Sequence, residues 1–562
     1  MKYANWNVPE RGAEIPCALL AAGCTPLLAA ILHLRGLSDP AAARSFLRGG
    51  AETLTNPLEL TGMVDAVQRL TRAVATGEHV AVYGDYDVDG ITAACLLTDY
   101  LRFRGLTCEL KIPDRISEGY GLNTAAIDAL AEEGVTLIVT VDCGVTNLEE
   151  TAYAAQRGVD MIVTDHHECR EALPEAEAVV DPKQPDSSGV GTALAGVGVA
   201  FKLVCAMEGD AEKMLARYGD LVAVGTVADV MPLLGENRFI TRCGLQKIAA
   251  GDCRPGFLAL AEEAGVRDKP FTASTVGFSL APRINAAGRL GEPSLAVRLL
   301  EETDLRRARV LAAELCAKNR ERQALETEIW REAVERLHGE QPDAPIVLAS
   351  EGWHPGVIGI VASRLTDAYS VPAVMICLDG ESGKGSCRST GSFNLFEALS
   401  ACSDCLEGFG GHAMAAGVTV RRGCVDELRS RLREYYLSHP DRTLPALEAD
   451  LLVDSPELLT MACVESLDEL EPCGNGNPRP LLYMENVSLD SVQPIGGGKH
   501  LRLKLAKFGQ TYDGVFFSQT APALGARAGQ RCDIVFAPQI NEFHGRRSVQ
   551  LVITDLRRSK EG

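Results

Sequence analysis

Acidic residues and histidines follow several apolar runs in the first half of this sequence. The run HVAVYG (79–84) leads into three aspartates at alternate positions, Asp85, Asp87 and Asp89. The same residue types follow later runs: Asp142 in VTVDCG, Asp165, His166 and His167 in IVTDHH, and Asp229 in AVGTVADVMPL. If these runs are parallel strands, their carboxyl ends share one edge of a sheet, where open α/β sheets bind ligands. We therefore expect these side chains to converge on one crevice.

Carboxylates crowded in this way repel one another, so each would become protonated unless a cation neutralises it. Oxygen ligands joined by one or two imidazoles suit Mn²⁺ or Mg²⁺. The ligands are too many for one ion once waters and substrate are counted, which favours two divalent cations that share one carboxylate. Two such ions can activate a water molecule and stabilise the leaving oxygen of a phosphoryl group. The sequence therefore predicts a metal-dependent phosphodiester hydrolase.

Each motif by itself has a simpler interpretation. A D-x-D-x-D triplet is also found in surface turns and in calcium loops, but a calcium loop counted from Asp85 needs Glu at its twelfth position, where this chain has Leu96. The two histidines could belong to a capped loop, and Asp142 could be a structural turn residue. The metal-centre hypothesis therefore depends on all these motifs lying at one sheet edge.

The surrounding elements are predicted from the hydrophobic pattern. From about 75 to 235, strand-like apolar runs alternate with Ala/Leu-rich helical stretches, which is typical of a parallel α/β sheet. Residues 296–337 are charged and contain no Gly or Pro, so they predict a long helical connector. A smaller α/β unit follows from about 343, and the tail from about 447 has short strands separated by turns. An oligonucleotide-binding barrel is the natural candidate for that tail.

Charge and composition narrow the class of protein. The net charge of −21 argues against a protein that coats nucleic acid non-specifically, yet residues 491–562 hold eleven basic and five acidic residues, a local charge of +6. The 18 cysteines, without a secretory signal pattern, favour reduced thiols in the cytoplasm. No run of 18 apolar residues is present, so we expect no membrane span.

The motifs DYDVDG, DCG and TDHH resemble those of the DHH phosphoesterase superfamily. Longer stretches are similar to the RecJ single-strand-specific exonucleases, and this resemblance extends over nearly the whole chain from about residue 50. These stretches are PDRISEGYGLN (113–123), LAGVGVAFKL (194–203), GTVADVMPL (225–233), ENRFITRCGLQKI (236–248), APRINAAGRL (281–290), GWHPGVIGIVASRL (352–365), GSCRS (385–389), FGGHAMAAG (409–417) and PCGNGNPRPLL (472–482).

The resemblance implies an architecture and an activity. The parts are an N-terminal helical extension (1–60), a parallel-sheet DHH domain (61–294), a helical connector (295–342), a smaller α/β DHH-associated domain (343–440) and an all-β OB-fold barrel that binds nucleic acid (447–560). The implied activity is that of a metal-dependent 5′-to-3′ exonuclease that degrades single-stranded DNA to mononucleotides in DNA repair and recombination. A monomer that works with a helicase and a single-strand-binding protein is the implied assembly.

The resemblance also implies roles for individual residues. Asp85, Asp87, Asp89, Asp142, His166 and Asp229 are expected to hold the metals, with Asp142 as the bridge. His167 is expected to contact the scissile phosphate, and Asp165 to brace the other ring nitrogen of His166. The residues expected to hold the strand in the channel are Arg115, Arg283, Asn285, Arg289, Asn319, Arg364, Ser386, Arg388, Ser389, Gly410, Gly411 and His412.

The barrel is expected to add a basic face and stacking groups. The candidate basic residues are Lys499, Arg502, Lys504, Lys507, Arg546 and Arg547. Phe508, Phe516, Phe517 and Phe543 are candidates for base stacking, although at least half of them should belong to the barrel core. Cys402 and Cys405 have zinc or redox spacing, but no second cysteine pair follows at a suitable distance.

Two other functions share parts of this pattern. A DHH phosphodiesterase of short oligoribonucleotides or cyclic dinucleotides would have the same metal ligands, but the basic barrel and the N-terminal extension favour long strands. A non-catalytic replication scaffold of the DHH fold would lose metal ligands, whereas this chain retains all of them.

Overall fold

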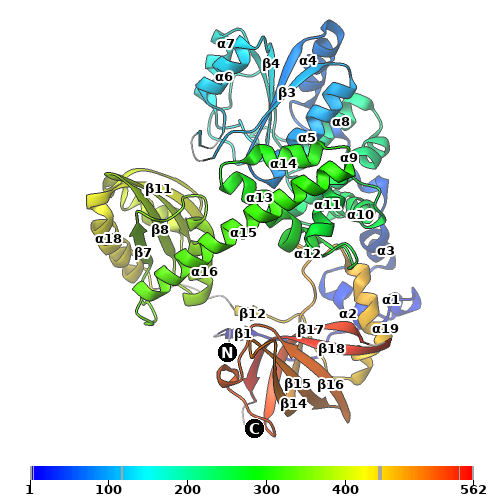
Figure 1. Cartoon of the computed structure of the whole chain (residues 1–562). Coiled ribbons are helices and arrows are strands. Elements are labelled where there is room, and N and C mark those ends of the chain that lie inside the picture. The colour runs from blue at the N-terminus through cyan, green and yellow to red at the C-terminus, as the bar shows by residue number, and fades with distance from the viewer. Residues whose placement is uncertain are drawn as a thin grey trace.

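Five parallel strands form the sheet that carries the strand-end motifs. In this computed structural model, which describes residues 3, 5–115, 118–119, 121–440, 446–543 and 545–559, the strand order is β3-β2-β4-β5-β6 (Figure 1). The strands are β2 (His79–Gly84), β3 (Thr107–Lys111), β4 (Leu137–Val141), β5 (Asp160–Thr164) and β6 (Ala178–Val180). The chain runs from β2 outward to β3 and then returns to the other side of β2. The carboxyl ends of β2 and β4 therefore meet where the strand order reverses, which is where such sheets bind ligands.

Helices cover both faces of this sheet because alternate strand residues are apolar on both sides. Val80, Val82 and Val139 face one core, whereas Ala81 and Tyr83 face the other. On the first face lie α4 (Met63–Thr76), α5 (Val88–Phe103), α8 (Gly196–Glu208) and α9 (Ala211–Ala228); on the second lie α6 (Thr124–Glu132) and α7 (Leu148–Gln156). Both faces of the sheet are thus buried, as the prediction of a parallel sheet requires.

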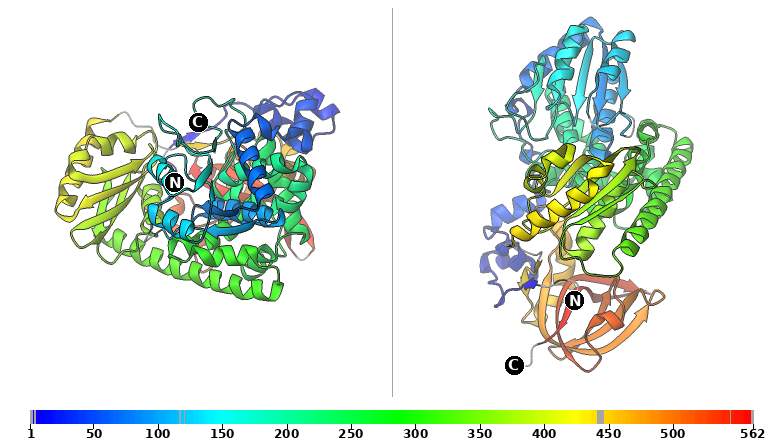
Figure 2. Two further views of the ribbon diagram at one scale, coloured as in Figure 1. Left: turned by 90° about the horizontal axis from the view of Figure 1, so that it is seen from above. Right: turned by 90° about the vertical axis from the view of Figure 1, so that its left-hand side faces the viewer.

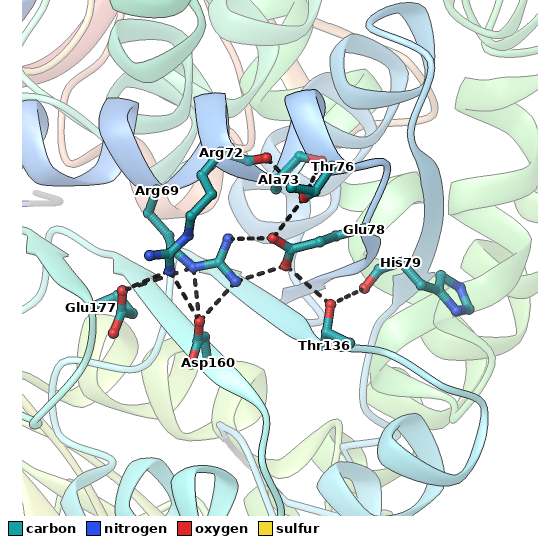
Figure 3. A network of polar contacts seen from close by, with 9 residues as sticks. All are labelled: Arg69, Arg72, Ala73, Thr76, Glu78, His79, Thr136, Asp160 and Glu177. Carbon is teal, nitrogen blue, oxygen red and sulfur yellow. Dashed lines mark hydrogen bonds and ion pairs between the residues drawn. The ribbon is translucent and has the colours of Figure 1, made fainter.

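A polar network at the opposite end of the sheet fixes α4 to the strands (Figure 3). The Arg69 guanidinium is nearly buried and lies 2.7 Å from Glu78 and 2.8 Å from Asp160. Thr136 donates a hydrogen bond of 3.1 Å to Glu78. These residues precede or begin β2, β4 and β5, so the network aligns the amino ends of the strands whose carboxyl ends carry the site.

A long helix joins the first domain to a second α/β domain. The helices that lead to it are α10 (Gly235–Ala250), α11 (Pro255–Glu263), α12 (Ala273–Thr275), the π-helical turn η3 (Val276–Leu280), α13 (Ala281–Arg289) and α14 (Pro293–Glu301). The connector itself is α15 (Leu305–Arg336). Its first half, with Ala308 and Leu315, packs in the first core, and its last turns, with Ile329 and Ala333, pack in the second. It therefore holds the two domains at a fixed spacing (Figures 1 and 2).

The second domain is a mixed sheet of order β10-β11-β9-β8-β7. Its strands are β7 (Ile346–Ser350), β8 (Ala373–Asp379), β9 (Ser382–Arg388), β10 (Leu406–Gly411) and β11 (Ala415–Arg421), and its helices are α16 (Ile358–Tyr369), α17 (Leu395–Ser400) and α18 (Val425–Ser438). The 3₁₀ turns of the molecule are η1 (Ala51–Thr53), η2 (Pro57–Glu59), η4 (Ser403–Cys405), η5 (Arg422–Cys424), η6 (Pro456–Leu459), η7 (Leu467–Leu470) and η8 (Pro522–Leu524).

The C-terminal strands close into a five-stranded barrel. Its strands are β14 (Leu482–Ile495), β15 (His500–Lys507), β16 (Gln510–Phe516), β17 (Arg531–Phe543) and β18 (Arg546–Arg558), in the order β14-β15-β16-β18-β17 with β17 also paired to β14. In this closed order the third strand pairs with the fifth, as in the OB-fold. The predicted fold class is therefore confirmed for the parallel-sheet domain, the connector, the smaller α/β domain and the barrel.

The N-terminal residues pack with the barrel, and the two together form one unit, which we call the barrel body. Strand β1 (Asn5–Asn7), which the helical prediction for residues 1–60 missed, pairs with β12 (Ala446–Glu448), while β13 (Leu451–Leu452) extends β14. Helices α1 (Cys17–Ala21), α2 (Pro26–Leu34), α3 (Pro40–Arg48) and α19 (Met461–Ser466) complete this region. Leu27, Leu28 and Ile31 share one apolar core with Leu482 and Phe536. The two ends of the chain thus build one core together.

One buried arginine fastens this body to the first domain. Arg238 of α10 is only 3% exposed, and its guanidinium donates to the carbonyl oxygens of Phe46, Leu470, Pro472, Glu469 and Glu471. Burial lowers the pKa of Arg238 to about 10, which still leaves it charged at neutral pH.

Within the described parts of the chain, no helix combines the length and apolarity needed to cross a membrane.

Replacing Arg238 by Met should destabilise the junction between the first domain and the barrel body. The five carbonyl oxygens would lose their shared donor, and each one left buried and unpaired costs about 1–3 kcal/mol. We expect a clear fall in the unfolding midpoint measured by calorimetry. Arg48→Met is the matched control, because the Arg48 side chain is 76% exposed and pairs with Glu469 at the surface. Equal shifts in the two variants would contradict the role assigned to Arg238.

Candidate metal centre and phosphate-binding groups

The structure brings the predicted acids and histidines together. Asp85 follows β2, Asp87 is the N-cap of α5 and accepts a hydrogen bond from the Gly90 N–H, and Asp89 lies in the first helical turn. Asp142 follows β4 in a left-handed conformation, with φ of 60°. The alternate spacing of the aspartates is therefore produced by a strand end that passes directly into a helix start.

Asp229 reaches the same crevice from a helix, which corrects the interpretation of AVGTVADVMPL as a further strand end. Helix α9 ends at Asp229, its C-cap. The preceding residues Leu221–Val224 are buried because α9 packs among α5, α8 and α10. A helix buried on all sides lacks the apolar periodicity of 3.6 residues, so its sequence cannot be told from a buried strand by pattern alone.

His166 lies at the centre of the cluster. Its Nε2 atom is 3.1 Å from Asp142 Oδ1, 3.6 Å from Asp229 Oδ2 and 3.8 Å from Asp89 Oδ2. Three overlapping sets have ligand atoms within 4.8 Å of one another: Asp142 with His166 and His167; Asp89 with His166 and Asp229; and Asp85 with Asp87 and Asp142. Asp142 belongs to both the first and the last of these sets, as a bridging ligand would.

Burial and mutual repulsion raise the pKa values of these carboxyl groups. The pKa of Asp85 rises to about 8 because of burial and the charge of Asp87, and that of Asp229 rises to about 7 for the same two reasons. Asp89 and Asp142 have pKa values well above the ordinary range because they are buried beside other acids. Conversely, burial and the charge of His167 lower the pKa of His166 to about 4, so its imidazole is neutral and can act as a ligand.

The donor set fits divalent cations. Among the described residues, Asp85 Oδ1 and Asp142 Oδ1 are buried and accept no hydrogen bond. Buried acceptor oxygens are normally paired, and buried acids that cannot find donors are neutralised by protons or by metal ions. Carboxylate oxygens with one neutral imidazole are ligands that Mn²⁺ and Mg²⁺ accept. Cysteine is absent from every candidate metal group in the described structure, so Cys402 and Cys405 are not supported as a zinc site.

Asp165 braces the second histidine, not the first as expected. Its carboxylate lies 2.8 Å from His167 Nδ1 and accepts hydrogen bonds from the N–H groups of His166 and Val145. Residues two apart at a strand end point to the same side, which pairs Asp165 with His167 and turns His166 the other way. Burial opposes the charge of His167, but the bond to Asp165 and the nearby acids raise its pKa to about 9.

The start of α8 is a part of the site to which the sequence analysis assigned no role. The N–H groups of Gly196 and Val197 donate to the two oxygens of Asp89 at 2.7 and 2.8 Å. A side chain on Gly196 would lie about 2.5 Å from the Asp142 Cβ atom, and one on Gly225 would lie 2.7 Å from Val197. The available signal was the glycines in the apolar stretches 194–203 and 221–228, because glycine lets two backbones approach closely.

Three arginines gather where the two α/β domains face each other. The Arg115 guanidinium stacks 5.0 Å from the ring centre of Tyr86, Arg289 donates to the Gly356 carbonyl at 3.1 Å, and Arg388 donates to Ser386 Oγ at 3.2 Å. Burial, with the charges of Arg115, Arg322 and Arg388, lowers the pKa of Arg289 to about 10. In the described structure, none of Arg115, Arg289 and Arg388 pairs with a carboxylate. Such a group attracts an anion.

Other predicted strand-binding residues serve different contacts. Asn285 accepts a hydrogen bond from the Val88 N–H and so holds the start of α5. Asn319 accepts from Arg322, and Arg364 pairs with Glu326 at 2.8 Å while stacking on Trp330. Arg283 donates to the Ser279 carbonyl and Ser389 to the Phe393 carbonyl. The structure therefore brings Arg115, Arg289, Ser386 and Arg388 together, whereas these five side chains are engaged in the contacts just described.

The remaining candidates lie in the second domain and the barrel, and most of them are exposed. Gly410 and Gly411 are the exposed last residues of β10, and His412 begins the exposed turn to β11. On the barrel, Lys499, Arg502 and Arg546 are exposed, whereas Lys504 pairs with Asp513 and Arg547 with Glu465. Phe516 belongs to the core and Phe508 packs against it, while Phe517 and Phe543 are 54% and 68% exposed. Ile116, Ser117 and Tyr120 of the 113–123 motif lie outside the described residues.

Replacing Asp142 by Asn should stabilise the metal-free protein and remove its response to Mn²⁺. Asn accepts the left-handed backbone of this position but carries no charge. A raised carboxyl pKa in the folded state means that the native protein binds more protons than the unfolded chain, so stability falls as pH rises from about 4 towards 8. The variant's unfolding midpoint should match that of the wild type near pH 4.5 and exceed it at pH 8.

The measurement is thermal unfolding at both pH values with and without Mn²⁺. Mn²⁺ should raise the midpoint of the wild-type protein at pH 8 and leave that of Asp142→Asn nearly unchanged. Asp404→Asn, an exposed partner of Arg431, is the control and should behave as the wild type. A full Mn²⁺ response in the Asp142 variant would exclude this residue from the metal centre.

Three comparisons with known proteins agree with this arrangement. Residues 79–226 match the DHH family, N-terminal domain; residues 333–437 match the DHHA1 domain; and residues 450–555 match the RecJ OB domain. The three matches correspond to the parallel sheet with its first helices, to the mixed sheet with the end of α15, and to the barrel.

Similar proteins cover the chain as a whole. The single-stranded-DNA-specific exonuclease RecJ of Bacillus subtilis is 40% identical over 94% of this chain and 68% of its own length, and that of Escherichia coli is 34% identical over 97% of both. A crystal structure of RecJ in complex with Mn²⁺ from Thermus thermophilus superposes with a TM-score of 0.85 and 31% identity over 99% of this chain and 80% of the other. The three matched domains and the identity to these relatives over nearly the whole chain show that this chain belongs to the RecJ family of single-stranded-DNA-specific exonucleases.

Proposed function

We propose that this protein is a metal-dependent exonuclease that degrades single-stranded DNA to mononucleotides from the 5′ end. The observation that carries the proposal is the position of His166 Nε2 within 3.8 Å of carboxylate oxygens from three separate elements. Relatives named as single-stranded-DNA-specific exonucleases, and a similar RecJ structure that holds Mn²⁺, support the same activity. A non-catalytic scaffold is disfavoured because every predicted ligand is present in one cluster.

The residues of the metal centre would have three separate roles. Asp85, Asp87, Asp89, Asp142, His166 and Asp229 would hold two divalent cations, which when bound activate water and stabilise the leaving oxygen. Asp165 fixes the orientation of the His167 ring, and the raised pKa of His167 keeps that ring protonated at neutral pH. That imidazolium would bind an oxygen of the scissile phosphate. The N–H groups of Gly196 and Val197 keep the Asp89 carboxylate in place.

The arginine group suits a terminal phosphate. A 5′-terminal phosphate carries more negative charge than an internal phosphodiester, so it is attracted more strongly by unneutralised arginines. Arg115, Arg289 and Arg388 with Ser386 would hold that end while the next phosphodiester lies at the metals. Asn285 connects the two regions, because it binds the start of α5 from the helix that ends in Arg289.

The barrel would hold the incoming strand. The exposed Lys499, Arg502 and Arg546 attract the backbone, and Phe517 and Phe543 offer faces on which bases can stack. We also propose the domain bounds 1–60, 61–294, 295–342, 343–440 and 447–560. The proposed setting is a cytoplasmic monomer that acts in DNA repair and recombination with a helicase and a single-strand-binding protein.

The main test uses a strand of 40 nucleotides labelled at either end, with Mn²⁺, Mg²⁺ or chelator. We expect mononucleotides released first from the 5′ end, with Mn²⁺ or Mg²⁺ required. Activity in chelator, or release from the 3′ end, would contradict the proposal. A dinucleotide substrate tested beside it separates the alternatives, because preferential cleavage of the dinucleotide would indicate a phosphodiesterase of short oligonucleotides.

Replacing Arg388 by Gln should weaken recognition of the terminal phosphate. A charge-assisted hydrogen bond contributes about 1.5–3 kcal/mol, which is about a 10- to 100-fold change in KM for a 5′-phosphorylated strand. A strand with a 5′-hydroxyl should change by less than about threefold, since it never makes this contact. Arg433→Gln is the control, because Arg433 is an exposed partner of Asp343 in the same domain. Equal losses on both substrates would exclude an end-specific role.

A further inference from the structure

The helix that delivers Asp229 to the metal centre ends in an unusual way. Asp229 is the C-cap of α9, and the next residue, Val230, has a φ of 58°. The Val230 N–H donates to the Val227 carbonyl at 3.2 Å and the Met231 N–H to the Thr226 carbonyl at 3.2 Å. This is the Schellman pattern, in which the left-handed position is normally occupied by glycine or asparagine.

Valine is among the least suitable residues for that position. A β-branched side chain with positive φ is a genuine outlier, because its two methyl groups crowd the backbone. Packing of the side chain does not explain the conformation, since Val230 is 65% exposed. Strain of this kind persists only where the surroundings over-determine the backbone, so another contact must hold Val230 in place.

The contact comes from the far end of the chain. Asn475 Nδ2 donates to the Val230 carbonyl oxygen at 2.8 Å, and the Asn475 carbonyl accepts from the Leu233 N–H at 2.8 Å. Gly474 lies close to the same turn, because a side chain there would meet Leu233 Cδ1 at 2.8 Å. Asn475 therefore binds the turn after Asp229 at two points, Val230 and Leu233.

The loop that carries Asn475 is itself held in place by hydrogen bonds on both sides of Asn475. Gly474 and Asn477 exchange two backbone hydrogen bonds, and the amide of Asn477, which is almost wholly buried, donates to the Leu470 and Pro472 carbonyls. The same segment is held by Arg238 through four of its carbonyls. Asn475 is thus fixed relative to the first domain even though it belongs to the segment that leads into the barrel.

We propose that Asn475 is a positioning residue for the metal centre: by holding Val230 in the left-handed conformation, it fixes the direction of the adjoining Asp229 carboxylate. Val230 needs this clamp because valine does not adopt the conformation by itself. The inference rests on the proposed role of Asp229 as a ligand. It assigns to the residues around 472–478 a function at a site that lies more than 240 positions earlier in the chain.

The test is titration of the full-length, metal-free protein with Mn²⁺ by calorimetry. Outer contacts that orient metal ligands typically change affinity 10- to 100-fold, so Asn475→Ala should weaken one of the two Mn²⁺ sites about tenfold. The Mn²⁺ concentration for half-maximal nuclease activity should rise by the same factor, with kcat at saturating Mn²⁺ nearly unchanged. Asn7→Ala is the matched control, because Asn7 is an exposed asparagine whose amide donates to Glu448.

The second variant removes the need for the clamp. Glycine adopts the left-handed conformation freely, so Val230→Gly combined with Asn475→Ala should recover most of the lost Mn²⁺ affinity. Wild-type affinity in Asn475→Ala, or a loss that Val230→Gly leaves uncorrected, would overturn the proposal. Asp229→Ala measured beside them separates the two hypotheses: unchanged binding there would show that Asp229 is no ligand, whatever Asn475 does.

Discussion

Repulsion among buried carboxylates is the constraint on which the rest of this structure depends. Burial, together with the charges of neighbouring acids that include Asp87, raises the pKa values of Asp85, Asp89, Asp142 and Asp229, so the fold must resist a force that would separate these groups. It does so by fixing each acid through the backbone. Asp85 and Asp142 follow strands of a sheet that is buried on both faces. Asp89 lies in the first turn of α5 and accepts hydrogen bonds from two N–H groups of α8, and Asp229 ends α9.

The same constraint explains why the acids come from so many elements. Carboxylates on neighbouring positions of one flexible loop could turn away from each other, whereas side chains on crossed, packed elements cannot. The polar network around Arg69 aligns the strands at their other end, and the glycines of α8 and α9 let those helices approach. A pre-arranged cluster of this kind favours cations over protons, because two divalent charges neutralise several acids at once.

The sequence predicted most of this arrangement because the important residues sit beside strong local signals. Asp85, Asp142 and Asp165 follow short apolar runs that alternate with helical stretches, which indicates parallel strands, and the strand ends of a parallel sheet meet at one edge. Asp229 was assigned to the wrong kind of element because a fully buried helix has no polar side. The role of Asp165 was assigned to the wrong histidine because that depends on which way two adjacent rings turn. The N–H groups of Gly196 and Val197 were missed because backbone donors leave no trace in side-chain chemistry.

The shared core of the barrel and the N-terminal helices has a consequence for how the protein is made. Leu27, Leu28 and Ile31 leave the ribosome long before their partners Leu482 and Phe536, which are synthesised more than 400 residues later. At ordinary rates of translation that interval is on the order of tens of seconds. Throughout it the apolar helix α2 lacks the strands that bury it, so the nascent chain exposes an apolar surface that chaperones would need to shield.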